Sequence, residues 1–337
     1  MKYKVALLLV VISAYLYYYL SPAPLSDEQL THHLTDKVVL ICGASSGIGE
    51  ELAYQLAAHR AKLVLVARSQ DKLDKVKTEL LIRGTPEENV LILSFDFSDV
   101  TRTKEVLDQT LNRFGALDYL VSNHAAMILG PFLGQPHLQS PDHVEKIFRV
   151  NLFSHIELAV HALPHLEKRN GHMFFTSSVA GEVAYYKNTL YSSSKHAMNG
   201  FFYSLQQELI ARESNLSLTI GAFGMIKTKE LTQLVKDENS GPLAGPLARP
   251  LAGSVEGCSR EIMKAYITRP QTLTFPRMVS AIYRASWYFN PYHHDHVIRI
   301  LRPEGSEGTG YEETVKKFAS NAKWRKKIGY QQGYGEQ

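Results

Sequence analysis

Cysteine and tryptophan are scarce in this chain, with two of each among 337 residues. Cys42 ends a short apolar run, where we expect it to be buried below a glycine turn, and a disulfide to Cys258 is therefore not expected. The shortage of cysteine does not identify a compartment. The 45% of apolar residues supply a large core, which needs no covalent links.

An excess of charge of one sign is also lacking. The chain carries 37 Lys and Arg against 33 Asp and Glu, a formal charge of +4, and its basic residues are scattered except near the C-terminus. A function in nucleic acid binding is therefore not indicated. The basic C-terminal segment has apolar residues at helical spacing, which leaves two interpretations, a solvated tail and a helix on a membrane surface.

No metal site is predicted either. The cluster His293, His294 and His296 follows Asn290-Pro291 and lacks a carboxylate at a convincing metal-ligand spacing. We interpret the cluster as a polar loop.

The N-terminus contains a long uncharged run, Val5 to Leu20, preceded by Lys2 and Lys4 and crowded with tyrosines at its distal end. The run is slightly shorter than the roughly 20 residues that span a bilayer, although interfacial tyrosines extend its reach. We interpret residues 1–22 as an uncleaved signal-anchor. The alternative is a cleaved signal peptide, which would give a secreted protein.

The charges around this run predict its orientation. Lysines precede it and Asp27 and Glu28 follow it, which places the N-terminus in the cytosol and the body in the lumen of the endoplasmic reticulum. The glycosylation sequon Asn215-Leu216-Ser217 fits a lumenal body, although such triplets occur often by chance.

From Lys37 onward, short apolar runs alternate with segments of helical period. This alternation predicts an α/β fold with a Rossmann-type, doubly wound parallel sheet. We expect one domain over residues 35–290 and a C-terminal extension over 291–337. The expected strands are Val38–Cys42, Lys62–Ala67, Leu91–Phe95, Leu117–Ser122, His172–Ser177 and Leu216–Ala222, and the first helix is Glu50–His59.

Residues 230–276 are expected to form a loop that shapes the substrate pocket. Within it, the Pro-Leu-Ala repeat over 241–253 is too short for the unit of a repeat fold and is expected to be a mobile loop. The following segment, Phe275–Phe289, mixes apolar and aromatic residues. It is expected to be a helix near the substrate or against lipid.

A glycine-rich turn, Gly43-Ala44-Ser45-Ser46-Gly47-Ile48-Gly49, lies between the first strand and the first helix. Without Cβ atoms, such a turn lets the backbone approach a pyrophosphate at a helix N-terminus. Its alternative interpretation is a tight strand-helix connection.

Arg68 and Ser69 follow the second strand, where an acidic residue would bind a ribose 2′-hydroxyl. Arg68 suits a 2′-phosphate, which favours NADP over NAD. The alternative is that Arg68 stacks on adenine or faces solvent. Asp96, at the end of the third strand, is expected either to bind the adenine amino group or to cap a helix over Ser98–Val106.

Tyr191 and Lys195 are four residues apart, so on a helix they share one face. A nearby ammonium favours the phenolate, which lets a tyrosine move a proton near neutral pH. The pair alone is a weak signal. Ser178 ends a strand and Asn151 is expected to open a helix, and both should meet the pair at the carboxyl edge of the sheet. Ser177 could cap a helix or turn, while Ser178 is the better candidate to polarise a carbonyl.

Together these motifs resemble the short-chain dehydrogenase/reductase family, and most closely its hydroxysteroid dehydrogenase branch, over residues 35–235. The resemblance implies that Tyr191 donates or accepts the substrate proton, Ser178 holds the substrate oxygen, Lys195 binds the nicotinamide ribose and Asn151 organises a relay water. Tyr185 resembles a substrate-contacting tyrosine. The expected cofactor contacts are Gly43, Ser45, Ser46, Gly47, Ile48, Gly49, Arg68, Ser69, Asp96, Phe97, Asn123, His124, Ala125, Tyr191, Lys195, Ile226 and Thr228.

The resemblance thus implies an NADP(H)-dependent oxidoreductase that interconverts a hydroxyl and a keto group on a lipophilic, steroid-like substrate. We expect the protein to be membrane-anchored and a homodimer. Two alternatives remain: a reductase of retinoids or lipid aldehydes, and a catalytically silent nucleotide-binding scaffold or sensor. The altered Asn123-His124-Ala125 and Phe223-Gly224 segments would suit the silent protein. Retention of serine, tyrosine, lysine and asparagine together favours the enzyme.

Overall fold

The computed structural model describes residues 25–127, 132, 135–184, 188–229, 232, 252–277, 280 and 284. The predicted anchor over 1–22, the extension 291–337, the 241–251 part of the Pro-Leu-Ala repeat, the histidine cluster at 293–296 and Tyr185 lie outside these residues, as does most of the 275–289 segment. The helices are α2 (Asp27–Leu34), α3 (Gly47–Ala58), α4 (Gln70–Ile82), α5 (Thr103–Phe114), α6 (Pro141–Phe148), α7 (Ser154–Glu167), α8 (Thr189–Ala211) and α10 (Val255–Thr268).

Seven parallel strands form one sheet in the order β3-β2-β1-β4-β5-β6-β7. This confirms the predicted doubly wound parallel sheet, and six strands lie within two residues of their predicted bounds. The strands are β1 (Val38–Cys42), β2 (Lys62–Ala67), β3 (Val90–Ser94), β4 (Tyr119–Ser122), β5 (His172–Ser178), β6 (Ser217–Phe223) and β7 (Thr272–Phe275).

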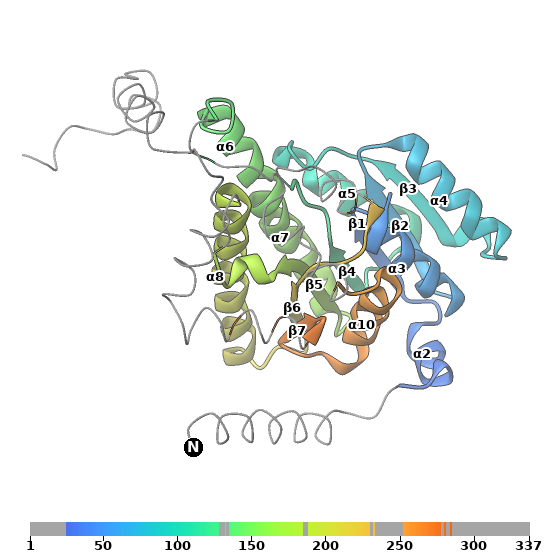
Figure 1. Ribbon diagram of the computed structural model, residues 1–337. Helices are drawn as coiled ribbons and strands as arrows, with labels where there is room; N and C mark the ends of the chain where they lie inside the picture. Colours follow the sequence, from blue (N-terminus) through green and yellow to red (C-terminus); the bar gives the residue numbers. More distant parts are fainter. Residues whose placement is uncertain are drawn as a thin grey trace, which may run out of the picture.

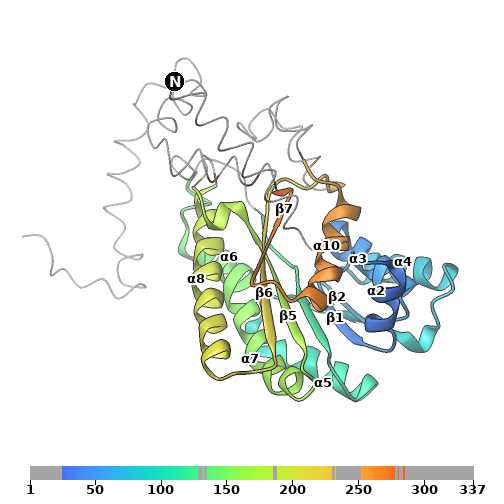
Figure 2. The same ribbon diagram turned by 90° about the horizontal axis from the view of Figure 1, so that it is seen from below.

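The sheet is buried between two helical layers, as Figure 2 shows. Alternate side chains of β1 point to opposite faces: Val39 and Ile41 join the core beneath α3, α4 and α10, whereas Leu40 and Cys42 join the core beneath α5, α7 and α8. Both faces of a strand are therefore apolar, which explains the continuous apolar runs in the sequence. Cys42 is fully buried, as predicted.

Two predictions of local structure are wrong. Asn151 does not open a helix, because it lies in a π-helical turn over Arg149–Phe153 that joins α6 to α7. The helix begins earlier, at α6, where Ser140 is the N-cap residue and Pro141 lies in the first turn. The 230–276 segment is not wholly a loop: it contains α10, which packs against α3, and β7, which extends the sheet beside β6.

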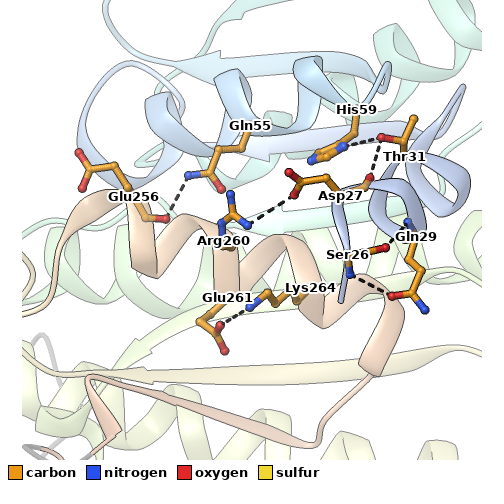
Figure 3. A network of polar contacts seen from close by, with 10 residues as sticks. All are labelled: Ser26, Asp27, Gln29, Thr31, Gln55, His59, Glu256, Arg260, Glu261 and Lys264. Carbon is orange, nitrogen blue, oxygen red and sulfur yellow. Dashed lines mark hydrogen bonds and ion pairs between the residues drawn. The ribbon is translucent and has the colours of Figure 1, made fainter. Parts of the chain in front are cut away.

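Polar contacts fasten the first described helix, α2, to the body of the protein (Figure 3). Asp27 forms an ion pair of 3.5 Å with Arg260 of α10, and Thr31 Oγ1 lies 2.8 Å from Nδ1 of His59, the residue after α3. Leu30 and Leu34 are fully buried. The chain therefore packs on the domain from the first described helix onward (Figure 1). Within the described ranges no helix is both long and apolar enough to cross a membrane.

Candidate active site

The candidate site lies at the carboxyl edge of the sheet, where β1 and β4 are neighbours. The chain runs from β1 outward to β2 and β3 and then returns to β4 on the other side of β1. In such sheets the reversal of strand order opens the crevice in which ligands bind. Cys42 pairs with Ser122, so the glycine turn and Asn123 leave the two strands side by side.

The glycine turn has backbone requirements that side chains would violate. Gly43 has φ +86°, and a Cβ atom there would lie 2.8 Å from the His124 backbone nitrogen. A Cβ atom on Gly49 would lie 2.1 Å from the Gly43 carbonyl oxygen. The Gly43 and Ala44 N–H groups donate to the Val66 carbonyl at 2.7 and 3.1 Å, which fixes the turn against β2. These constraints on packing are expected both for a pyrophosphate-binding turn and for a tight strand-helix connection, so they do not distinguish the two interpretations.

The first turn of α3 has no side-chain cap. Ser46, its N-cap residue, makes no side-chain capping hydrogen bond, so its side chain satisfies none of the free N–H groups that follow it. Free N–H groups at a helix N-terminus suit an anion such as a phosphate. The arrangement therefore fits a pyrophosphate at Ser45, Ser46, Gly47 and Ile48.

Asn123 and His124 close the same crevice from β4. Asn123 donates its N–H to the Cys42 carbonyl at 3.0 Å and Nδ2 to the Gly43 carbonyl at 3.3 Å. The His124 ring stacks on Phe97 at 3.8 Å and on His155 at 4.0 Å between ring centroids. Ala125, the third residue of this segment, is exposed.

Burial holds His124 and His155 in their neutral forms, since it lowers the pKa of both rings well below the usual range. His124 Nε2 lies 2.7 Å from Ser154 Oγ, whose hydroxyl donates to the Val150 carbonyl at 2.8 Å. Nε2 is therefore the donor, and Nδ1 is left as a buried acceptor with no partner among the described residues.

The remaining residues that were predicted to contact the nucleotide follow β2 and β3. Arg68 is exposed at the end of β2, and Ser69 is the N-cap of α4 without a side-chain capping bond. Asp96 is exposed and accepts the Ser98 N–H at 2.9 Å, while α5 begins only at Thr103, so Asp96 closes a turn and does not cap the predicted helix over Ser98–Val106.

Tyr191 and Ser178 lie close together at the carboxyl edge of the sheet. Tyr191 is 8% exposed, burial raises its pKa to about 12, and a hydrogen bond from Ser178 acts in the opposite direction. The Ala180 N–H donates to Ser178 Oγ at 3.1 Å, and Ser178 Oγ lies 3.2 Å from the Phe223 carbonyl. Ser178, and not Ser177, therefore caps the turn that follows β5.

Lys195 lies one helical turn after Tyr191, with Nζ 5.8 Å from the centre of the tyrosine ring. Nζ donates to the Thr176 carbonyl at 2.7 Å. Burial lowers the pKa of Lys195 to about 7. Polar ligand groups near Nζ would favour the charged form and so support a phenolate at Tyr191.

Asn151 completes the cluster. Its Oδ1 accepts the Ala126 N–H at 2.7 Å, and its Nδ2 donates to the Ala126 carbonyl at 2.9 Å and to Ser194 Oγ at 3.1 Å. The π-helical turn supplies the extra residue that places this side chain beside the β4 edge.

Two of the predicted cofactor contacts, Ile226 and Thr228, follow β6 in the chain. Ile226 is buried and forms a β-bridge with Gly253.

This arrangement matches a known family. The family model described as short chain dehydrogenase covers residues 37–239. The chain belongs to the short-chain dehydrogenase family. Members of this family are oxidoreductases whose Rossmann fold binds a nicotinamide cofactor, and the glycine turn and the uncapped α3 N-terminus fit that cofactor.

Several curated relatives bear the name hydroxysteroid 11-beta-dehydrogenase 1-like protein. The Xenopus tropicalis protein is 36% identical over 205 residues, 61% of this chain and 70% of the relative. Protein A of Xenopus laevis is 30% identical over 253 residues, 74% and 81% respectively. The human protein is 33% identical over 204 residues, 60% and 63% respectively.

Solved structures share the fold at lower identity. A short-chain dehydrogenase/reductase of unknown function from Caenorhabditis elegans, with cofactor, has a TM-score of 0.61 at 23% identity and covers 73% of this chain and 97% of its own. An alcohol dehydrogenase from Thermococcus sibiricus complexed with 5-hydroxy-NADP has a TM-score of 0.58 at 23% identity, with coverages of 71% and 95%.

Three buried side chains around the cluster of this short-chain dehydrogenase were not predicted from its sequence. Ser194 lies inside the Tyr-x-x-x-Lys motif and contacts Asn151, His155 stacks on His124, and Asn199 contacts the Ser178 turn. Only Asn199 carries a sequence signal, because it continues the four-residue spacing of Tyr191 and Lys195 along α8.

Proposed function

We propose that the protein is an NADP(H)-dependent oxidoreductase that interconverts a hydroxyl and a keto group on a lipophilic, steroid-like substrate. The observation that carries this proposal is that Ser178, Tyr191 and Lys195 lie together at the carboxyl edge of the sheet, the edge from which the glycine turn leaves, with Asn151 joined to their helix through Ser194. A scaffold without chemistry has no need for buried groups with opposed pKa shifts at one place.

In this proposal a bound nicotinamide supplies or takes up the hydride. Tyr191 moves the proton at its hydroxyl: burial keeps the phenol protonated, so it is ready to donate to a substrate oxygen. Ser178, which already lies beside Tyr191, holds that oxygen by its hydroxyl. Lys195 holds the nicotinamide ribose, and its ammonium supports the phenolate that remains after proton donation.

Asn151 organises the route by which Tyr191 regains its proton. Its Oδ1 and Nδ2 are both occupied by the Ala126 backbone, which fixes the amide plane. The amide contacts Ser194, the residue before Lys195 in α8, and Oδ1 keeps a second lone pair that suits an ordered water between the lysine and solvent. The other contacts to the cofactor are assigned to the glycine turn, Arg68, Ser69, Asp96, Phe97, Asn123, His124, Ala125, Ile226 and Thr228.

The preference for NADP rests on Arg68. The side chain of Arg68 is exposed at the end of β2. Its guanidinium suits the 2′-phosphate of NADP, which carries negative charge and several acceptor oxygens. Arg68→Ala is expected to raise the Kd for NADPH about tenfold and to leave that for NADH unchanged. Arg83→Ala, at another exposed arginine outside the crevice, serves as the matched control.

The steroid-like substrate is supported by the names of the relatives, and a retinoid or lipid aldehyde is the second candidate. The membrane anchor over 1–22 and a lumenal body in the endoplasmic reticulum are supported by the charge pattern of the sequence. Protease protection of microsomes tests this orientation, since a lumenal body is degraded only after detergent is added.

A homodimer is supported by the outer faces of α7 and α8. Phe153, just before α7, and Val160 within it are 44% and 56% exposed, and Phe201 of α8 is 38% exposed. Large apolar side chains that are exposed on the surface are candidates for a protein interface. Sedimentation of the purified protein tests this assignment.

The decisive experiment is turnover by the purified full chain. NADPH absorbance is followed with a panel of ketosteroids, retinal and long-chain aldehydes, and NADP⁺ reduction is followed with the matching alcohols. Tyr191→Phe should abolish turnover and leave NADPH binding intact, while Tyr203→Phe, on the same helix, should retain both. Turnover that survives Tyr191→Phe overturns the mechanism, and a wild type that binds NADPH without any turnover favours the silent scaffold.

A further inference from the structure

Asn199 is a buried amide on the face of α8 that also carries Tyr191 and Lys195. It lies one turn beyond Lys195 and is 3% exposed. Its Oδ1 accepts the Ser177 hydroxyl at 2.5 Å, and its Nδ2 donates to the Gly181 carbonyl at 3.0 Å. Both partners flank Ser178 in the chain, one before and one after it.

The turn after Ser178 packs directly on α8. A Cβ atom on Gly181 would lie 2.8 Å from Asn199 Nδ2 and 2.8 Å from the Lys195 carbonyl oxygen. Glycine is therefore needed at this position because the two backbones approach so closely. The place of the turn relative to α8 depends on this contact and on the two hydrogen bonds from Asn199.

We infer that Asn199 is a positioning residue, which sets the Ser178 hydroxyl at a fixed place relative to the Tyr191 hydroxyl. Tyr191 and Asn199 belong to one helix, α8. The helix therefore fixes the Tyr191 hydroxyl directly, and it fixes the Ser178 hydroxyl through Asn199 and the turn. The inference deepens the proposed function and rests on it.

The chemistry of the amide explains why asparagine suits this position. One side chain must accept from a hydroxyl and donate to a carbonyl, and an amide does both while staying neutral. An aspartate would accept from Ser177 but could not donate to Gly181 when ionised. A leucine of similar size would do neither, and it would leave two buried polar groups without partners.

The test compares Asn199→Leu and Asn199→Asp with a matched change on the same helix. Gln206 is 5% exposed, and its Nε2 donates to the carbonyls of Leu218 and Gln271 at 2.8 and 2.6 Å, away from the Ser178 turn. Gln206→Leu therefore removes comparable buried hydrogen bonds from α8. Any general loss of stability is shared by the two leucine variants, as urea unfolding will record.

We expect Asn199→Leu to lower kcat about tenfold or more with NADPH and the fastest carbonyl of the panel, because small displacements of positioned groups are costly. The Kd for NADPH should stay within about twofold. Asn199→Asp should show a smaller loss. Gln206→Leu should keep the kcat of the wild type.

The pH profile provides a readout that a purely structural role would not move. The Ser178 hydrogen bond lowers the pKa of Tyr191, so weakening it should shift the Tyr191 limb of the kcat profile to higher pH in Asn199→Leu. Gln206→Leu should leave the profile in place. An Asn199→Leu enzyme with the kcat and profile of the wild type overturns the inference, as does an equal loss of kcat in both leucine variants.

A structural readout separates this inference from the proposed function. If the wild type binds NADPH but turns over no panel compound, the proposed function fails. Crystal structures of wild type and Asn199→Leu with NADP⁺ then decide the positioning role. We expect Ser178 Oγ to move about 1 Å or more relative to the Tyr191 hydroxyl in the variant, a displacement on the scale that matters for catalysis. An unchanged position overturns the inference.

Discussion

Asn151 Nδ2 donates to Ser194 Oγ at 3.1 Å, which joins the π-helical turn to the helix that carries Tyr191 and Lys195. Ser194 is fully buried, and its hydroxyl donates onward to the Tyr191 carbonyl at 2.8 Å. The asparagine is thus fixed on one side by the Ala126 backbone and on the other by α8. This serine couples two members of the proposed site.

Ser194→Ala should therefore lower kcat about threefold to tenfold and cost about 1 kcal/mol of stability, because a buried amide loses one of its partners. Steady-state kinetics and urea unfolding measure the two effects. Ser193→Ala is the control: Ser193 is exposed and donates to the Leu190 carbonyl at 3.0 Å, so both quantities should stay close to wild type. Equal kcat values for the two variants would contradict a coupling role for Ser194.

Gly49→Ala should weaken NADPH binding about tenfold or more. The new Cβ would lie 2.1 Å from the Gly43 carbonyl oxygen, and neither backbone can yield without moving the turn. Isothermal titration calorimetry with NADPH measures the change.

Gly84→Ala separates this collision from backbone strain. Gly84 has φ +89°, but nothing lies within 4 Å of its would-be Cβ. The substitution should cost about 1 kcal/mol of stability from strain alone and leave the Kd for NADPH unchanged. A Gly49→Ala protein with wild-type affinity would show that the turn does not hold the cofactor.

Most of the sheet could be predicted because its strands are buried on both faces and appear as unbroken apolar runs. The exceptions show the limits of this signal. β7 is four residues long and alternates Thr and Leu or Phe, and its place in the sheet depends on pairing with β6. Helix α10 was missed because its buried residues, Cys258, Ile262, Met263 and Tyr266, follow a segment dominated by a proline repeat.

The candidate site shows the same division. Tyr191 and Lys195 could be predicted because their spacing on one helix is a local property. The contacts of Ser194 and Asn199 could not, because each depends on a partner supplied by another part of the chain. Asn151 contacts the helix of Tyr191 and Lys195 through Ser194, but its local structure was predicted wrongly, since a π-helical turn has no periodicity that distinguishes it from a helix start.

The lowered pKa of Lys195 should make the free energy of unfolding depend on pH when no cofactor is added. Burial lowers its pKa to about 7, against about 10.4 in an unfolded chain. Between these values the unfolded chain binds a proton that the folded protein releases, so this group makes stability rise with pH.

Lys195→Met removes the proton and keeps the length of the side chain. The free energy of unfolding of the variant minus that of wild type should fall by about 2 kcal/mol from pH 7 to pH 9, as measured by urea unfolding. The lost hydrogen bond to Thr176 affects both pH values equally and cancels. Lys104→Met, at an exposed lysine, should show no such trend. A constant difference for Lys195→Met would mean that Lys195 remains charged when folded.

The ion pair between Glu182 and Arg284 links the end of the Ser178 turn to the segment beyond β7. Arg284 donates Nε and Nη2 to the two carboxylate oxygens, with Nη2 at 2.7 Å, and Nη2 also lies 3.1 Å from Thr274 Oγ1. The side chains are 15% and 35% exposed. Glu182 and Arg284 are 102 residues apart in the sequence, so the ion pair stabilises tertiary structure and not a local turn.

A double-mutant cycle of Glu182→Gln and Arg284→Gln should give a coupling energy of about 1 to 2 kcal/mol, because the pair is bidentate and partly shielded from water. The Lys104–Asp108 pair on α5 is the control: its side chains are 62% and 48% exposed, and its cycle should give no more than about 0.5 kcal/mol. Sodium chloride at 1 M should reduce the coupling of Glu182 and Arg284 only in part, since shielded charges are screened less than exposed ones. Equal coupling in the two cycles would show that the Glu182–Arg284 pair behaves as an ordinary surface contact and does not hold the turn to the segment after β7.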